Sequence, residues 1–335
     1  MTPILTIKQM TQAEINSEKN GITRVKLMQN AAKAILDFLE SRFILSETSI
    51  AVIVGSGNNG GDGAALAKLL NNKGIRTALI ALGGLPKTDT AKACLEQTKG
   101  ELPPIFNENA ENILNRADII IDSVFGTGFH GELPENLIPL FKAVNQSEAV
   151  KISVDIPSGI NGDTGIIAPH SFRPDITLVL AAMKTGLLNL PCADHCGETV
   201  ILDIGITEDC YKEYDGLFTE EDVKTLFPRR PKHSNKGAFG KLLNIAGCNK
   251  YIGAAVLSSK AALRSGTGLV CLASVPKVTG IAAAVIPECV FIELSGDKDG
   301  YILRNAFDEI APEINGFSAV SFGCGMGNTE ETRKT

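Results

Sequence analysis

The sequence predicts an α/β protein built on parallel β-sheets that helices cover on both faces. Short apolar runs of strand length, rich in β-branched residues, alternate with segments whose apolar residues recur at helical spacing. This alternation is typical of parallel sheets. A hydrophobic content of 44% over 335 residues can bury a large core, and the length favours about two domains.

The first 40 residues predict helices. Ile7–Glu40 carries an apolar stripe near the 3.6-residue period, and Gly21 divides it into two stretches. Gln29 and Asn30 lie among the packing residues of the second stretch. Two interpretations are open for them: a solvent-facing side of the helix, or a place in the wall of a ligand cleft.

A strand followed by a glycine-rich turn is the centre of the predicted fold. Ile50–Val54 predicts a buried strand, residues 55–63 read GSGNNGGDG, and Ala64–Leu70 returns to helical spacing. Strand, glycine turn and helix N-terminus together bring backbone N–H groups to a phosphate. The asparagines and the aspartate of this turn either offer oxygen atoms to a cation, a sugar or an amide, or only stabilise left-handed turn conformations.

Further units continue the alternation, and the expected arrangement is a Rossmann-like doubly wound sheet. The expected strands are Ile75–Ala81, Asp118–Asp122, Lys151–Asp155, Asp175–Ala181 and Thr199–Ile204, and the expected helices are Thr88–Lys99 and Asn136–Asn145.

Polar, glycine-rich segments follow two of these strands, and a lysine follows a third. Residues 122–132 read DSVFGTGFHGE, residues 153–165 read SVDIPSGINGDTG, and Lys184 follows the strand that ends near Ala181. The carboxyl ends of parallel strands share one edge of the sheet, where ligands bind. The sequence therefore predicts one ligand site at the edge that also carries the glycine turn.

A second α/β unit is expected from Thr219 onward. PRRPKHSNKG at 228–237 predicts a basic, proline-rich linker. A glycine turn at Gly323–Gly327 and the start of a helix come last, so we expect this domain to be incomplete. The expected elements are a helix at Thr219–Leu226, strands at Leu242–Ala246, Leu269–Ala273, Val290–Leu294 and Ala319–Phe322, and helices at Gly253–Ser265 and Val278–Val285.

Composition argues against several classes of protein. A net charge of -6 and a pI of about 5.4 disfavour a nucleic-acid partner. We find neither a bilayer-length apolar run nor a signal-peptide pattern, and therefore expect no membrane partner and a cytoplasmic location. Eight cysteines in a chain of this length favour buried thiols over a disulfide scaffold. Cys192, His195 and Cys196 lack a second ligand pair, which favours an ordinary loop over a zinc site.

These motifs identify a resemblance. Residues 1–218 resemble NAD(P)H-hydrate epimerases, through GSGNNGGDG, DSVFGTGFHGE and SVDIPSGINGDTG in that order. Residues 219–335 resemble the N-terminal part of the ADP-dependent NAD(P)H-hydrate dehydratases, which have a ribokinase-like α/β fold. This resemblance rests on KHSNKGAFGKLLNIAG at 232–247, YIGAAVLSSKAALRSGTGL at 251–269, and GCGMG at 323–327. The whole resembles a bifunctional nicotinamide nucleotide repair protein that is cut short.

The resemblance implies a substrate, a cation and a set of site residues. The substrate would be hydrated NADH or NADPH, whose R and S forms the epimerase interconverts so that an S-specific dehydratase can restore the cofactor with ADP or ATP. Potassium would be held by Asn59, Asp122 and Ser158, and we expect a homo-oligomer. The implied substrate-binding residues are Asn58, Asn59, Gly60, Gly61, Asp62, Gly126, Thr127, Gly128, Phe129, His130, Gly131, Glu132 and Asp155 in the first domain, and Ala254 and Gly325 in the second.

Asp155 is the expected catalytic residue, because a carboxyl beside the ring can protonate the leaving hydroxyl and then take a proton from water. The alternative is a residue that only caps the following turn. Lys184 either meets Asp155 or a phosphate, or is solvated. The dehydratase family has a later catalytic aspartate and a later glycine-rich ADP loop, neither of which this sequence contains, so we expect no dehydration by this chain.

Two functions of other classes compete with this interpretation. The first is a non-catalytic module of the same fold that binds a nucleotide or a protein, and the retained Asp122, Asp155 and NNGGD run argue against it. The second is an NAD-dependent oxidoreductase. No acidic residue ends the strand Ile75–Ala81, although an ordinary dinucleotide fingerprint has one there.

Overall fold

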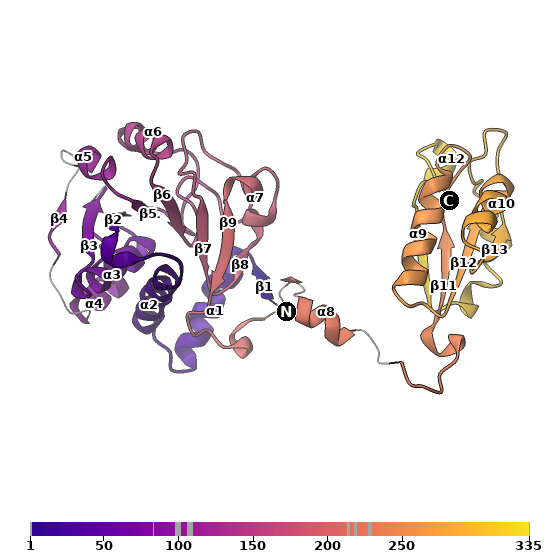
Figure 1. Cartoon of the computed structure of the whole chain (residues 1–335), viewed down its shortest axis with the longest axis horizontal. Coiled ribbons are helices and arrows are strands. Elements are labelled where there is room, and N and C mark those ends of the chain that lie inside the picture. The colour runs from indigo at the N-terminus through magenta and orange to yellow at the C-terminus, as the bar shows by residue number, and fades with distance from the viewer. Residues whose placement is uncertain are drawn as a thin grey trace. The chain divides into compact units, whose positions relative to one another are not determined.

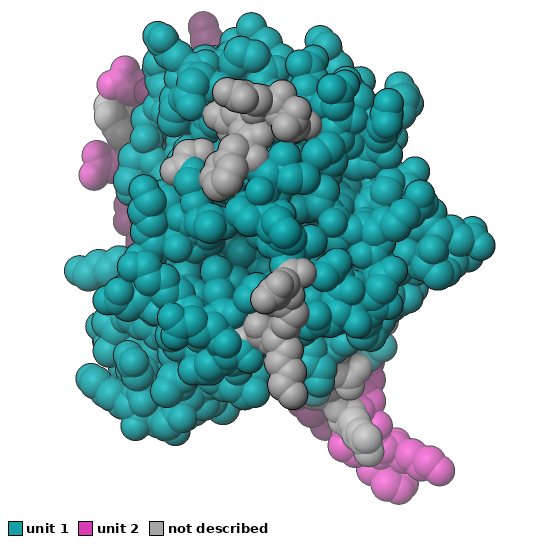
Figure 2. All heavy atoms as spheres, turned by 90° about the vertical axis from the view of Figure 1, so that its left-hand side faces the viewer, with its two compact units in different colours: residues 1–227 teal, residues 228–335 magenta. Residues whose placement is uncertain are grey.

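The computed structural model describes residues 2–82, 84–97, 102–105, 110–212, 215–217, 220–226 and 230–334. They form two compact units, residues 1–227 and residues 228–335 (Figures 1 and 2). In this division, α8 (Glu220–Leu226) is counted with unit 1. The domain boundary that we expect from the sequence, at residue 218, stays a prediction.

A seven-stranded parallel sheet forms the centre of unit 1, which confirms the expected α/β class. Its strand order is β4-β3-β2-β5-β6-β7-β9. The sequence did not predict the short edge strand β4. The strands are β2 (Ser49–Val54), β3 (Arg76–Ala81), β4 (Pro104–Ile105), β5 (Ile119–Ser123), β6 (Val150–Val154), β7 (Ile176–Leu180) and β9 (Glu198–Leu202).

Helices cover both faces of this sheet (Figure 1). On one face, alternate residues of β2 and β5, such as Val52 and Ile121, pack with α2, α3 and α4. On the other face, their neighbours Ile53 and Ile120 pack with α5 and α6. Strands buried on both faces explain the continuous apolar runs in the sequence. The helices are α2 (Arg24–Arg42), α3 (Asn58–Asn72), α4 (Asp89–Gln97), α5 (Ala110–Leu114) and α6 (Ile138–Gln146).

A small second sheet in unit 1 holds the N-terminal strand and was not predicted. Strand β1 (Thr2–Leu5) pairs in parallel with β8 (Met183–Lys184) and antiparallel with β10 (Asp215–Leu217). Helix α1 (Ile7–Lys19) follows directly, with Thr6 as N-cap in a capping box with Gln9. The pairing of β1 therefore fixes where α1 begins. A short helix, α7 (Cys192–His195), lies before β9.

Helix α3 begins at Asn58, so the prediction of a glycine loop up to Gly63 was wrong. Gly57 is the N-cap, and the glycine run forms the first turns of the helix. The low helix propensity of glycine is overridden by packing, because the helix lies too close to its neighbours for side chains. A Cβ on Gly60 would lie 1.9 Å from the carbonyl oxygen of Gly55, and one on Gly63 would lie 2.5 Å from the Ser123 Cβ.

Unit 2 has a four-stranded parallel sheet in the order β13-β12-β11-β14. Each predicted strand and helix that lies fully within its described residues is present, with bounds that differ by at most two residues. The elements are β11 (Lys241–Ile245), α9 (Ile252–Arg264), β12 (Leu269–Ser274), α10 (Pro276–Val285), β13 (Val290–Glu293), α11 (Ala306–Ile310), β14 (Ala319–Phe322) and α12 (Glu330–Lys334). Part of the predicted linker, residues 228 and 229, lies outside the described residues.

The close approach at Gly60 gives a stability prediction. Gly60→Ala forces backbone apart at the start of α3, and we expect a loss of about 1–3 kcal/mol or more in the free energy of unfolding. Urea denaturation measures this loss. Gly128→Ala is the control, because nothing lies within 4 Å of a Cβ at that position, and its unfolding midpoint should stay near the wild-type value. Equal midpoints for the two variants would contradict the packing argument.

Candidate functional site

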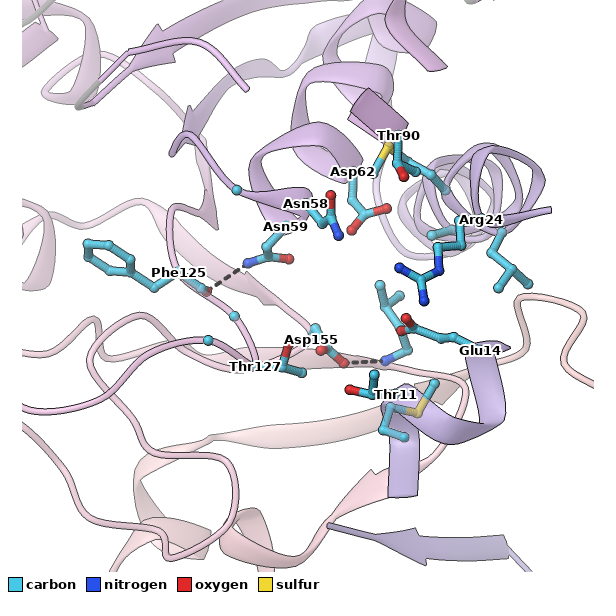
Figure 3. A pocket seen from close by; sticks show the side chains of 18 of the residues that line it. Thr11, Glu14, Arg24, Asn58, Asn59, Asp62, Thr90, Phe125, Thr127 and Asp155 are labelled. Carbon is cyan, nitrogen blue, oxygen red and sulfur yellow. Dashed lines mark hydrogen bonds between the residues drawn. The ribbon is translucent and has the colours of Figure 1, made fainter. Parts of the chain in front are cut away.

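A cavity of about 510 Å³ lies in unit 1 at the carboxyl ends of β2, β5, β6 and β7 (Figure 3). The sheet order changes direction here, because β3 and β4 extend from β2 to one side while β6, β7 and β9 extend from β5 to the other. Ligands bind at such switch points. Residues 56–59 and 124–129 line the cavity, and α1 and α2 contribute the remaining wall. The structure thus brings the predicted polar segments to one edge.

Asp155 lies in the cavity directly after β6. Its backbone has a left-handed φ of 66°, which is uncommon for a non-glycine residue and clusters at functional sites. Its N–H donates to the Leu178 carbonyl (2.8 Å), and its Oδ1 accepts from the Leu180 N–H (3.1 Å). The residue is only 8% exposed. These bonds to β7 orient the carboxylate toward the cavity.

Lys184 is the cation of this carboxylate. Its Nζ forms an ion pair with Asp155 Oδ1 and donates to the Leu180 carbonyl at 2.8 Å. The residue is 1% exposed, so the solvated alternative was wrong. Lys184 lies on β8, where it pairs with Leu5 of β1. The ion pair therefore connects the residue after β6 to β8.

Asp62 provides a second carboxyl from α3. Burial raises its pKa well above the usual value, the negative charges of Asp155 and Glu14 raise it further, and Lys184 lowers it. A carboxyl held toward its neutral form can donate a hydrogen bond. Nearby, the Asn58 Oδ1 accepts from the Thr88 hydroxyl at 2.5 Å, which positions the first residue of the helix. The first N–H groups of α3 have no partner within the helix and are available to a ligand.

A third carboxyl, Glu14, and an arginine, Arg24, line the cavity from α1 and α2, and sequence reasoning missed both. Burial is the main cause that raises the pKa of Glu14; Asp155 raises it too, while Arg24 and Lys184 lower it. The Arg24 Nε lies 3.7 Å from the Glu18 carboxylate. One signal was present in the sequence. Glu14 follows Met10 by four residues, which places a carboxyl on the apolar side of the helix.

A cluster of oxygen atoms lies where β5 and β6 end. Asp122 is fully buried and accepts hydrogen bonds from the Ser158 hydroxyl (2.6 Å) and N–H (2.8 Å). Burial raises the pKa of Asp122 to about 6, although bonds from Ser158, Val124 and Ser153 lower it. The Asn59 amide donates to the Phe125 carbonyl at 2.7 Å, and its buried Oδ1 has no hydrogen-bond partner among the described residues. Asn59, Asp122 and Ser158 thus lie near the same Phe125 segment.

Several predicted site residues do not line this cavity. Gly60 and Gly61 are enclosed in α3, where they allow close packing. His130 bonds to Asn161, with 2.9 Å between Nδ1 and Nδ2. The predicted residues that line it are Asn58, Asn59, Asp62, Gly126, Thr127, Gly128, Phe129 and Asp155, and those that do not are Gly60, Gly61, His130, Gly131 and Glu132.

The two site residues predicted in unit 2 are neighbours. Gly325 has a left-handed φ of 72°, and a Cβ built there would lie 2.5 Å from the Cβ of Ala254. Gly325 follows β14, and Ala254 lies in the first turn of α9. Strands β14 and β11 flank the point where the order of this sheet changes direction. The pair therefore lies at the position where such sheets bind ligands.

Contacts place two groups of residues for which the sequence allows two interpretations. Gln29 donates to Gln97, and Asn30 donates to the Ile204 carbonyl at 2.8 Å, so neither is among the cavity-lining residues. The Sγ atoms of Cys192, in α7, and of Cys196, directly after this helix, lie 3.8 Å apart. Among the described residues, no three His, Cys, Asp or Glu side chains gather as metal ligands, and no helix there is long and apolar enough to span a membrane.

Comparisons with known proteins match both units. Residues 24–186 match the family described as YjeF-related protein N-terminus, and residues 242–335 match NAD(P)H-hydrate dehydratase. The chain is 35% identical to the bifunctional NAD(P)H-hydrate repair enzyme of Dictyoglomus turgidum, over 99% of this chain and 66% of that protein. It is 31% identical to the enzyme of that name from Methanothermobacter thermautotrophicus, over 97% and 62%. The chain thus spans slightly less than two thirds of these relatives.

A solved structure supports the fold. The yeast protein YNL200c superposes with a TM-score of 0.51 at 23% identity, over 60% of this chain and 87% of that one. The expectation that the second domain is cut short is tested by none of these matches. The two family matches thus lie one in each unit, at residues 24–186 of unit 1 and residues 242–335 of unit 2.

Proposed function

We propose that unit 1 interconverts the R and S forms of hydrated NADH and NADPH, with Asp155 as acid and base. The observation that carries this proposal is the buried Asp155–Lys184 pair, in a cavity that also holds a helix N-terminus. The names of the relatives, repair enzymes for NAD(P)H hydrates, support the choice of substrate. ADP-dependent dehydration would then act on the S form, and our expectation that this chain lacks it stays a prediction.

The chemistry requires a proton donor and acceptor but no redox partner. The hydrated carbon bears a hydroxyl next to the ring nitrogen, whose electron pair can expel the hydroxyl once it is protonated. The product is a planar cation, and water can add to either face. A carboxylate nearby stabilises this cation and exchanges protons with an oxygen on the face that it contacts. The dinucleotide phosphates would meet the N-terminus of α3, which favours anions.

Potassium is the cofactor that the oxygen cluster fits. Asn59 offers an amide oxygen without a hydrogen-bond partner among the described residues, Asp122 offers a buried carboxylate, and Ser158 offers a hydroxyl. These are hard donors, which suit group I and II cations rather than soft metals. A bound cation would supply the positive charge that the buried Asp122 lacks. It would also join the α3 terminus to the loops after β5 and β6.

The first test of this proposal is the variant Asp155→Asn. It keeps the shape of the side chain but cannot transfer the proton, so we expect R and S hydrates to exchange at least about 10²-fold more slowly. Proton NMR of the hydrate mixture measures the exchange. Asp118→Asn is the matched control, since that carboxylate precedes β5 at the opposite end of the sheet. Exchange at the wild-type rate in Asp155→Asn would exclude an acid–base role.

The potassium site is tested by thermal unfolding without substrate. A ligand that binds the folded state raises its stability by about 2.7 kcal/mol at 100 times its Kd. Potassium chloride should therefore raise the Tm more than lithium chloride of equal ionic strength, and Asn59→Leu should remove the difference. Asn16→Leu is the control, because its amide also donates to a backbone carbonyl, that of Cys210, at 2.9 Å. Identical Tm values in the two salts would refute the site.

A further inference from the structure

Inversion through a planar cation needs proton transfer on both faces of the ring. The leaving hydroxyl must be protonated on one face, and the water that enters on the other face must lose a proton. Asp155 is fixed by β7 and Lys184, so it can serve only the face that it contacts. A second group on the other face is therefore required, and this requirement rests on the function proposed above.

Glu14 is the candidate for that group. Its carboxyl points into the cavity from α1, whereas Asp155 follows β6, so the two approach the enclosed space from separate elements (Figure 3). Among the described residues the Glu14 carboxyl takes part in no hydrogen bond and no ion pair within 4 Å. It is partly exposed to the cavity rather than enclosed in the protein. An acid without a protein partner is free to bond a substrate hydroxyl.

The two carboxyls have different surroundings. The Lys184 ammonium and the Leu180 N–H both contact Oδ1 of Asp155. Burial and the charge of Asp155 raise the pKa of Glu14, and these outweigh Arg24 and Lys184, which lower it. The charged groups that act on Glu14 are thus Arg24, Lys184 and Asp155, and Glu14 in turn raises the pKa of Asp62. A two-face mechanism starts with one carboxyl protonated and the other ionised.

We propose that Glu14 is a second catalytic acid–base residue, which serves the ring face opposite Asp155. When the substrate hydroxyl lies on the Glu14 side, Glu14 gives it a proton, the C–O bond breaks with its electron pair on oxygen, and water leaves. A new water then forms a C–O bond on the other face and gives its proton to Asp155. The product has the inverted configuration and the pair has exchanged its proton. The reverse reaction runs through the same steps.

The test follows solvent oxygen as well as configuration. In water enriched in oxygen-18, each inversion by the wild type brings one labelled oxygen into the hydrate. Glu14→Gln should slow inversion about 10²-fold. Asp155 can still remove and return water on its own face, so one epimer should gain label without inverting. We expect the ratio of label incorporation to inversion, measured by mass spectrometry and proton NMR, to rise at least tenfold.

Two further variants separate a catalytic role from a structural one. Glu18→Gln removes the next glutamate of α1, which pairs with Arg24 but does not line the cavity, and it should invert at the wild-type rate. Glu14→Asp keeps a carboxyl and should recover part of the inversion. The inference is overturned if Glu14→Gln inverts the hydrates at the wild-type rate. It is equally overturned if label incorporation and inversion fall by the same factor in this variant. It is also overturned if Asp62→Asn, rather than Glu14→Gln, raises the ratio of label incorporation to inversion.

The wild-type measurement distinguishes a failure of the proposed function from a failure of the role proposed for Glu14. A wild-type chain that fails to invert the hydrates faster than a protein-free sample overturns the proposed function, and the role of Glu14 with it. A wild type that inverts them, together with a Glu14→Gln variant in which label and inversion stay coupled, overturns only the role of Glu14.

Discussion

The ion pair between Lys184 and Asp155 is the interaction on which the geometry of the cavity depends. It joins the end of β6 to β8, and the Leu180 carbonyl and N–H attach both partners to the end of β7. Removing two charges from water is costly, and the cost is recovered only when hydrogen bonds satisfy the remaining atoms. Here the backbone of β7 provides those bonds. The pair is therefore held in one orientation, and the left-handed backbone at Asp155 is held with it.

The strand that carries Lys184 also helps to position the N-terminal helix. Lys184 is on β8, β8 pairs with β1, and α1 follows β1 after a single residue. The Asp163 carboxylate also accepts from the Ile7 N–H at 2.7 Å, which attaches the first turn of α1 to the loop after β6. Glu14 thus reaches the cavity through a chain of backbone contacts that begins at the ion pair. A change at Lys184 would disturb both carboxyls at once.

Most of the sheet could be predicted from the sequence, because strands buried on both faces are continuous apolar runs, such as Ile50–Val54. The short strands could not, since Pro104–Ile105 and Met183–Lys184 are too short to show a period. The start of α3 was misplaced because glycine propensity is a local property, whereas the contacts of Gly60 and Gly63 are tertiary. In unit 2 the alternation was clearer, and the elements followed it.

The site residues also fall into some that the sequence predicts and others that it does not. Asp155 and the asparagines of the glycine turn were found because they follow strands, and strand ends converge in any parallel sheet. Glu14 and Arg24 precede the first strand of that sheet, and no period or spacing relates a helix there to a strand end. The pairing of β1 with β8 and the bond from Ile7 to Asp163 bring α1 and Glu14 to the cavity, and the packing of α2 on α3 brings Arg24. Charged residues of a site can thus come from outside the sequence motif that identifies the site. Here the electrostatics of the cavity identify Glu14 and Arg24, which the sequence motifs do not.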